Sequence, residues 1–276
     1  MKKHIITFIA AILCLAANAQ TQDPYLKLYE NLVSRVGYDG IGVWSLLEKW
    51  SKADSCGVNL QVAKFNYHFA KSRKDSVTIH SGRKYLGMDP VLSLKDSTGN
   101  DIYYFSEPFY DEAEFNLAIS DLDMALAANN DRLDLYATMA DALSAYEKEK
   151  TGMTMKFLSE MIDRNYRKGN KWLLPDGEAD NETFTSLMQT YCYLMYQKGS
   201  PEGYEAFKSI SEKMLKYEKN NANFTNNIGS YYLVYKQDDK TALKYYKKAL
   251  KINAEDEVAT KNIKLIERRA RAAAKK

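Results

Sequence analysis

The chain has 276 residues, of which 45% are hydrophobic and 27% charged, and its formal net charge is +3. This near-neutral net charge gives no support to a nucleic-acid role, so we expect no nucleic-acid partner. Three cysteines are too few for a scaffold built on disulfides. The length suits one sizeable domain or an extended array of repeats.

Residues 1–19 have the pattern of a secretory signal peptide. Two lysines precede an apolar run over residues 5–17, and Ala17-Asn18-Ala19 supplies a small-x-small cleavage site before Gln20. The run is too short to span a membrane as a helix. Cys14 follows Leu13 rather than a small residue, which does not fit a lipoprotein signal. We therefore predict an exported protein, periplasmic or secreted, with no stable membrane insertion once the signal is removed.

Residues 20–105 are predicted to form an N-terminal helical region that contains a small β insertion. Apolar stripes at helical spacing run through residues 41–53 and 58–70, which predicts a pair of helices. Between residues 75 and 105 the apolar period changes to two. The turn formers of residues 96–100 separate two strand-like runs, which predicts a β-hairpin.

Residues 106–276 are predicted to form an array of helical hairpins. Ala242, Tyr246 and Ala249 recur at steps of four and three, so they share one helix face. Gly229 lies on the preceding predicted helix, where a residue without a side chain lets two helix backbones approach closely. The same spacing occurs earlier, at Ala118, Leu122 and Ala125.

This pattern resembles the tetratricopeptide repeat (TPR), a helix–turn–helix unit of about 34 residues. The overall plan is similar to that of secreted bacterial TPR proteins. The pair Asn227 and Ile228 returns after 35 residues, and we place the extra residue in a loop at 236–241. The resemblance implies a mainly all-α solenoid of TPR-like hairpins, with the β-hairpin insertion near residues 75–105. Lys264 replaces the crossing glycine of the last repeat, so the final helix is expected to cap the array.

The resemblance also implies a binding surface. In TPR arrays the first helices of the hairpins line a groove, and an asparagine before the Leu-Gly pair can hold a peptide backbone. Asn227 and Asn262 occupy this place, and Tyr231 is a candidate aromatic contact beside them. Ser230 stands where clamp-type repeats carry a second asparagine, which argues against a clamp for a C-terminal carboxylate.

The sequence contains no motif for catalysis, metal binding or a cofactor. Only His68 and His80 remain after the signal is removed, and neither belongs to a cluster with metal-ligand spacing. No phosphate-binding glycine loop and no nucleophile elbow is present. We predict no catalytic residue, no metal site and no cofactor, and hence a protein that is not an enzyme.

The function we predict is an exported scaffold that binds a protein or peptide partner. Two alternatives remain: a glycan-binding helical protein of the starch-utilisation type, and an enzyme on a helical frame. Two features stay open as well. The apolar loop at residues 170–175 either plugs the array or forms a contact surface, and Cys56 and Cys192 either pair or remain free thiols.

Overall fold

The computed structural model describes residues 23–274, so the predicted signal peptide lies outside the described residues. Two compact units divide this part of the chain. Unit 1 comprises residues 23–83, 89–146 and 170–180, and unit 2 comprises residues 84–88, 147–169 and 181–274. The limit predicted between residues 105 and 106 falls inside a strand that runs from Asp101 to Tyr110.

Unit 1 is built on five helices among its described residues: α1 (Pro24–Val36), α2 (Val43–Ala53), α3 (Val58–Ser72), α4 (Glu112–Ala128) and α5 (Leu133–Glu147). The predicted pair corresponds to α2 and α3 and is confirmed, whereas α1 was not predicted. The first three helices pack around Trp50, which is 1% exposed and lies among Tyr29, Leu47 and Leu60.

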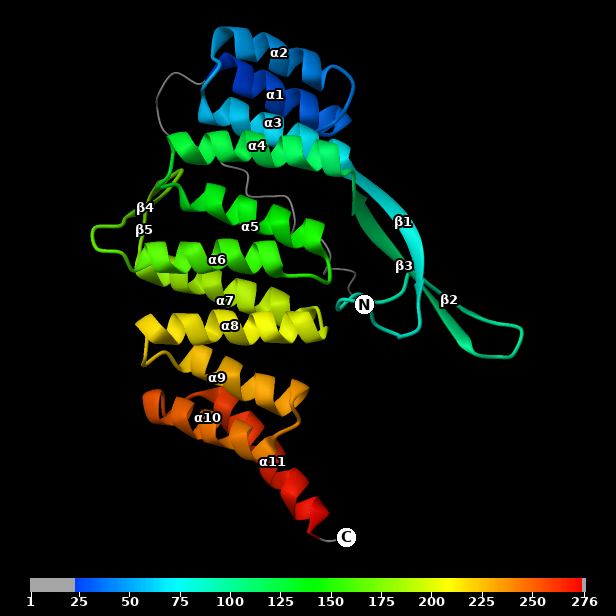
Figure 1. Ribbon diagram of the computed structural model, residues 1–276, viewed down its shortest axis with the longest axis vertical. Helices are drawn as coiled ribbons and strands as arrows, with labels where there is room; N and C mark the ends of the chain where they lie inside the picture. Colours follow the sequence, from blue (N-terminus) through cyan, green and yellow to red (C-terminus); the bar gives the residue numbers. More distant parts are fainter. Residues whose placement is uncertain (1–22, 275–276) are drawn as a thin grey trace. The chain divides into compact units, whose positions relative to one another are not determined.

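The β insertion lies in the turn of a helical hairpin formed by α3 and α4 (Figure 1). The backbone N–H of Asp111 donates to the carbonyl of Ser72 at 2.7 Å, so the chain leaves and re-enters the helices at one point. Between them, β1 (Arg73–His80), β2 (Leu92–Lys95) and β3 (Asp101–Tyr110) form an antiparallel sheet in the order β1-β3-β2. The predicted hairpin is the β2–β3 pair, and β1 extends it to three strands.

The apolar loop at residues 170–175 packs inside unit 1. It forms a short hairpin of β4 (Trp172–Leu174) and β5 (Gly177–Ala179). Trp172 is 2% exposed, and its ring meets that of Tyr136 on α5 edge-on at 5.0 Å. The loop therefore fills space beside α5, and Trp172 is not available as a surface contact.

Unit 2 stacks helical hairpins in chain order (Figure 1). Its helices are α6 (Gly152–Asn165), α7 (Asn181–Gln197), α8 (Pro201–Tyr217), α9 (Ala222–Ser230), α10 (Asp239–Ile252) and α11 (Glu257–Ala273). Helices α7 and α8 form one hairpin, and α9 and α10 form the next. Helices α7 and α9, the first helices of these two hairpins, contact each other. Helix α6, which precedes them in the chain, contacts α8, the second helix of the first hairpin. Such stacking of neighbouring hairpins is the packing of an α-solenoid.

Glycines lie where the helices of these hairpins cross. A Cβ atom on Gly229 would lie 2.9 Å from Cε1 of Tyr246, a fully buried ring on α10. A Cβ atom on Gly203 would lie 2.6 Å from the carbonyl oxygen of Met195 on α7. The sequence pattern predicted the first crossing and missed the second.

The extra residue of the 35-residue spacing is absorbed within a helix. Helix α9 continues as a π-helix, η1 (Tyr231–Tyr235), in which the N–H of Lys236 donates to the carbonyl of Tyr231 at 3.2 Å. A π-turn accommodates one additional residue without breaking the helix. Placing this residue in the loop at 236–241 was therefore wrong.

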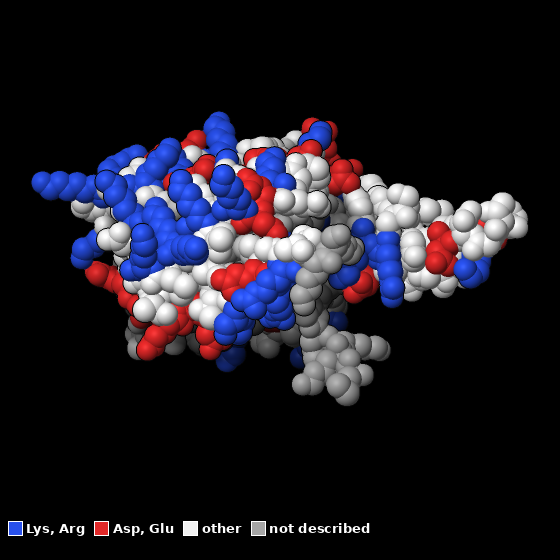
Figure 2. Space-filling model, turned by 90° about the horizontal axis from the view of Figure 1, so that it is seen from below, with Lys and Arg blue, Asp and Glu red and all other residues white. Residues whose placement is uncertain are grey.

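Helix α11 covers the last hairpin, as predicted for a cap. Ala259 and Ile266 are buried against the cluster of Ala242, Tyr246 and Ala249. Figure 2 shows lysines and arginines gathered over this end of unit 2. Among residues 23–274, no helix combines the length and the apolar character that a membrane span requires.

Candidate functional site

A groove of about 460 Å³ lies between the first helices of two successive hairpins of unit 2. Seven residues of α7 and α9 line it: Thr185, Ser186, Gln189, Thr190, Tyr193, Asn223 and Phe224. The Phe224 ring is fully buried at its floor, whereas the Tyr193 side chain is 56% exposed. None of the lining side chains is charged, so the groove offers amides, hydroxyls and aromatic surface.

Asn227 lies beneath this groove and not on its surface. Its Nδ2 donates to Oε1 of Gln189 at 3.0 Å and to Oγ of Ser211 at 3.1 Å. Its Oδ1 accepts from Nε2 of Gln189 at 3.1 Å. Asn227 is only 8% exposed and its amide is engaged within the protein, so it positions Gln189.

Tyr231 and Asn262 do not line the groove. The Tyr231 hydroxyl donates to Oε1 of Glu205 at 2.6 Å, and the ammonium groups of Lys208 and Lys236 lie 5.3 Å from its ring centre. Burial and the bond to Glu205 raise the pKa of Tyr231. This residue therefore ties η1 to α8. Asn262 is half-buried on α11, away from the residues that line the groove.

The groove residues that sequence reasoning missed follow one face of α7. Ser186, Gln189 and Tyr193 recur at steps of three and four, opposite the buried face that carries Met188. A polar stripe at helical spacing was the available signal. Polar stripes usually face solvent, and the sequence does not show which of them meets a second helix.

Glu218 anchors the end of the groove. Its carboxylate accepts hydrogen bonds from the Tyr166 hydroxyl at 2.5 Å and from Asn181, Thr185 and Asn221 at 2.8 to 2.9 Å. Burial alone would raise the pKa of Glu218, but these hydrogen bonds outweigh it and hold the pKa below its usual range. Thr185 is thereby held in place at the groove wall.

Unit 1 contains a separate pocket of about 430 Å³ between α1, α3 and α5. Apolar side chains dominate its lining, among them Leu26, Val33, Val62 and Phe69. Arg132 at its edge forms a bidentate pair with Asp134, with both N–O distances at 2.7 Å.

His68 and His80 both lie beside carboxylates within unit 1. In unit 1, His68 Nδ1 lies 2.9 Å from Oε2 of Glu114, and His80 Nε2 lies 2.6 Å from Oε1 of Glu107. No group of three or more His, Cys, Asp or Glu residues within 23–274 is placed to hold a metal ion. Cys56 and Cys192 are free thiols, and burial raises the pKa of the Cys192 thiol to about 12.

Stacked hairpins with glycine at their crossings define the class of this protein: a TPR-like α-solenoid, here with a β insertion in one hairpin. No family model matches the sequence, and no curated protein matches it. Among solved structures the chain is similar to YrrB, described as a TPR protein with an unusual peptide-binding site. The two chains are 16% identical, the match covers 87% of this chain and 91% of YrrB, and the TM-score is 0.38. The stacked hairpins of this chain, with glycines at their crossings, are what make it TPR-like.

Proposed function

We propose that this protein is an exported scaffold, without catalytic activity of its own, that binds an extended segment of a partner protein in the groove between α7 and α9. The observation that carries the proposal is the groove itself. It lies on the first-helix side of the stacked hairpins and exposes Tyr193 beside the amides of Gln189 and Asn223. Amide and hydroxyl groups of this kind can satisfy the N–H and C=O groups of a bound backbone.

The dimensions of the groove suit a peptide. From Thr185 to Tyr193, the α7 residues at the two ends of the groove, the helix rises by about 12 Å. An extended chain of about four residues covers that length. The reciprocal bonds between Asn227 and Gln189 hold the Gln189 amide in one orientation, which lowers the entropy cost of binding.

The test is a selection from an unbiased peptide library with the mature protein, followed by titration of the selected peptides. Ser186→Arg places a long charged side chain in the groove and should weaken binding at least tenfold. Ser209→Arg is the matched control, since Ser209 is an exposed serine on α8 outside the groove. Equal affinity of both variants and wild type would reject the groove as the binding site.

Export is a separate part of the proposal and is supported by the sequence pattern of residues 1–19. The mature protein recovered from its native envelope or medium should begin at Gln20 by N-terminal sequencing. Recovery of intact Met1 from a cytosolic fraction would contradict export and leave peptide binding untouched.

A further inference from the structure

A second pocket of unit 2, of about 590 Å³, adjoins the groove at Tyr193, which lines both. Its lining carries four tyrosines: Tyr85, Tyr193, Tyr196 and Tyr204. We call it the tyrosine pocket. Charged residues of both signs, Lys84, Lys198 and Glu149, also line it.

A loop that belongs to unit 2, Lys84–Met88, builds one wall of the tyrosine pocket. The chain leaves unit 1 after Arg83, contributes Lys84–Met88 to unit 2 and then returns to unit 1. Within this loop, Tyr85 and Met88 exchange backbone hydrogen bonds at 3.2 and 2.8 Å. The loop thus forms a tight turn that brings Tyr85 to the pocket.

Gly87 allows this turn to lie directly on the end of α7. Its φ is +78°, and a Cβ atom there would lie 2.3 Å from the carbonyl oxygen of Gln197. Both the backbone conformation and the close approach favour glycine. Any larger residue at position 87 must push the loop away from α7, and Tyr85 would move with it.

The remaining tyrosines are held in place before any ligand arrives. The ring of Tyr204 meets that of Tyr196 edge-on at 5.5 Å and stacks on that of Tyr235 at 5.0 Å. The Tyr193 hydroxyl accepts from Nε2 of Gln197 at 2.7 Å. Rigid aromatic side chains lose little conformational entropy when they bind.

We infer that the tyrosine pocket binds a proline-containing part of the same extended peptide, an inference that rests on the proposed function. Proline-rich segments adopt the polyproline II helix before binding, and grooves lined by aromatic rings receive them at low entropy cost. Tyrosine rings offer faces for the proline ring, while hydroxyl and amide groups donate to its backbone carbonyls. The uncharged groove and the tyrosine pocket meet at Tyr193. One extended peptide chain can therefore occupy both, whereas a single sugar ring cannot.

Binding of a labelled decaproline peptide, measured by fluorescence anisotropy, tests this inference. The mature protein should bind decaproline at least tenfold more tightly than a decamer of alternating glycine and serine. Gly87→Ala should weaken decaproline binding at least fivefold, because it displaces the loop that carries Tyr85.

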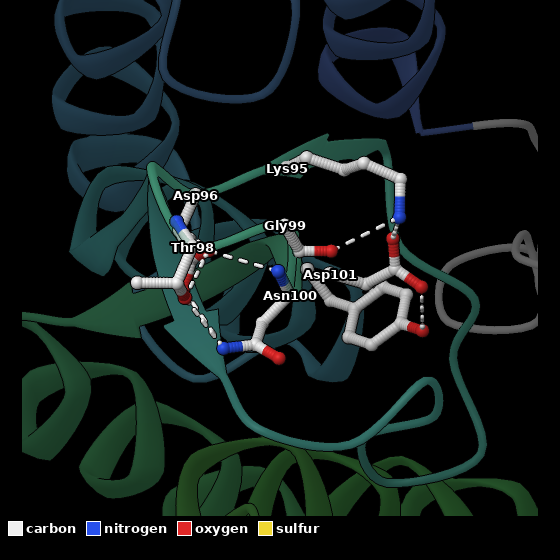
Figure 3. Close-up of polar contacts among 7 residues, drawn as sticks. Lys95, Asp96, Thr98, Gly99, Asn100 and Asp101 are labelled. Carbon is white, nitrogen blue, oxygen red and sulfur yellow. Dashed lines mark hydrogen bonds and ion pairs between the residues drawn. The ribbon is translucent and has the colours of Figure 1, made fainter.

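Gly99→Ala is the matched control. Gly99 lies in the β2–β3 turn with a φ of +90°, and a Cβ atom there would meet nothing within 4 Å. In that turn Asp96 accepts from the backbone N–H groups of Thr98 and Asn100, both at 2.8 Å, and Lys95 Nζ donates to the Gly99 carbonyl at 3.2 Å (Figure 3). The control carries the same kind of backbone strain on the same insertion but does not touch the pocket, so it should bind like wild type.

Tyr85→Ala provides a second variant that leaves the backbone unstrained, and it should also weaken decaproline binding at least fivefold. Equal binding of the two decamers, or equal decaproline binding by Gly87→Ala, Tyr85→Ala and Gly99→Ala, would overturn the inference. If maltoheptaose bound instead, with the same dependence on Gly87, the pocket would be assigned to carbohydrate. If Ser186→Arg still weakened the binding of the library peptides in that event, the groove would remain a peptide-binding site.

Discussion

Asn227 of α9 and Gln189 of α7 exchange two amide hydrogen bonds, at 3.0 and 3.1 Å, between the first helices of successive hairpins. The Asn227 end of this pair is buried, and the Gln189 end reaches the groove. One residue thus belongs to the core of the repeat stack and the other to the groove that we propose binds a peptide. The pair couples the stability of the stack to the shape of the groove.

Asn227→Ala is therefore expected to destabilise the protein. The substitution removes the partners of Gln189 and Ser211 in a buried setting, which costs about 1–3 kcal/mol of unfolding free energy. Urea unfolding followed by circular dichroism measures the loss. Asn223→Ala, at an exposed position of α9, is the control and should stay within about 0.5 kcal/mol of wild type. Equal midpoints for both variants would show that the buried pair adds nothing.

Gly229→Ala should lower the melting temperature by several degrees. The new methyl group would lie 2.9 to 3.1 Å from ring carbons of Tyr246, which is fully buried and whose hydroxyl lies 3.0 Å from that of Ser230. Overpacking of this kind costs about 1–3 kcal/mol and outweighs the gain in helix propensity of about 1 kcal/mol. Gly152→Ala on α6 is the comparison, because the nearest atom to its methyl group would be 3.7 Å away. If Gly229→Ala had the same melting temperature as Gly152→Ala, the crossing of α9 and α10 at Gly229 would not be tight.

The Glu218 carboxylate should make unit 2 sensitive to acid. Hydrogen bonds hold the folded-state pKa of Glu218 below that of a free glutamate, about 4.3, so the unfolded state binds more protons as the pH falls. The stability from Glu218 is present above pH of about 4.3 and is lost as the pH falls through the folded-state pKa. Glu218→Gln should be less stable than wild type at pH 7, and the difference should shrink below pH of about 4. Glu202→Gln, an exposed change on α8, controls for charge, and a pH-independent difference for Glu218→Gln would refute this account.

Removing α11 should expose the end of the repeat stack. A chain that ends at Ala254 loses the buried Ile266 and the partly buried Ile263, and full burial of an isoleucine contributes about 1.5–3 kcal/mol. Such a chain should melt earlier and aggregate. A chain that ends at Arg269 keeps the buried face and the ion pair between Arg269 and Asp239 at 3.3 Å, and it should behave like the full protein. Thermal melts of both truncations test whether α11 is a structural cap. An unchanged melting temperature for the chain that ends at Ala254 would contradict that role.

The sequence by itself determined the parts of the fold that follow from local periodicity. The steps between Ala242, Tyr246 and Ala249 predicted one buried face of α10, and Gly229 predicted the helix that crosses it. The turn formers at residues 96–100 predicted the β2–β3 hairpin. These features depend on neighbours three or four residues apart, or on the conformation of single turns, so they can be read along the chain.

Only the tertiary structure decided which polar and aromatic side chains form the candidate site. Asn227 was predicted to contact a ligand, but its amide pairs with Gln189, 38 residues away in the chain. Tyr85 reaches the tyrosine pocket because Gly87 allows the loop Lys84–Met88 of unit 2 to pack on the end of α7. Such contacts depend on how distant elements stack and on where close backbone approach is sterically allowed. Local periodicity carries no information about either, because it reports the buried face of a helix and not the partner that covers it.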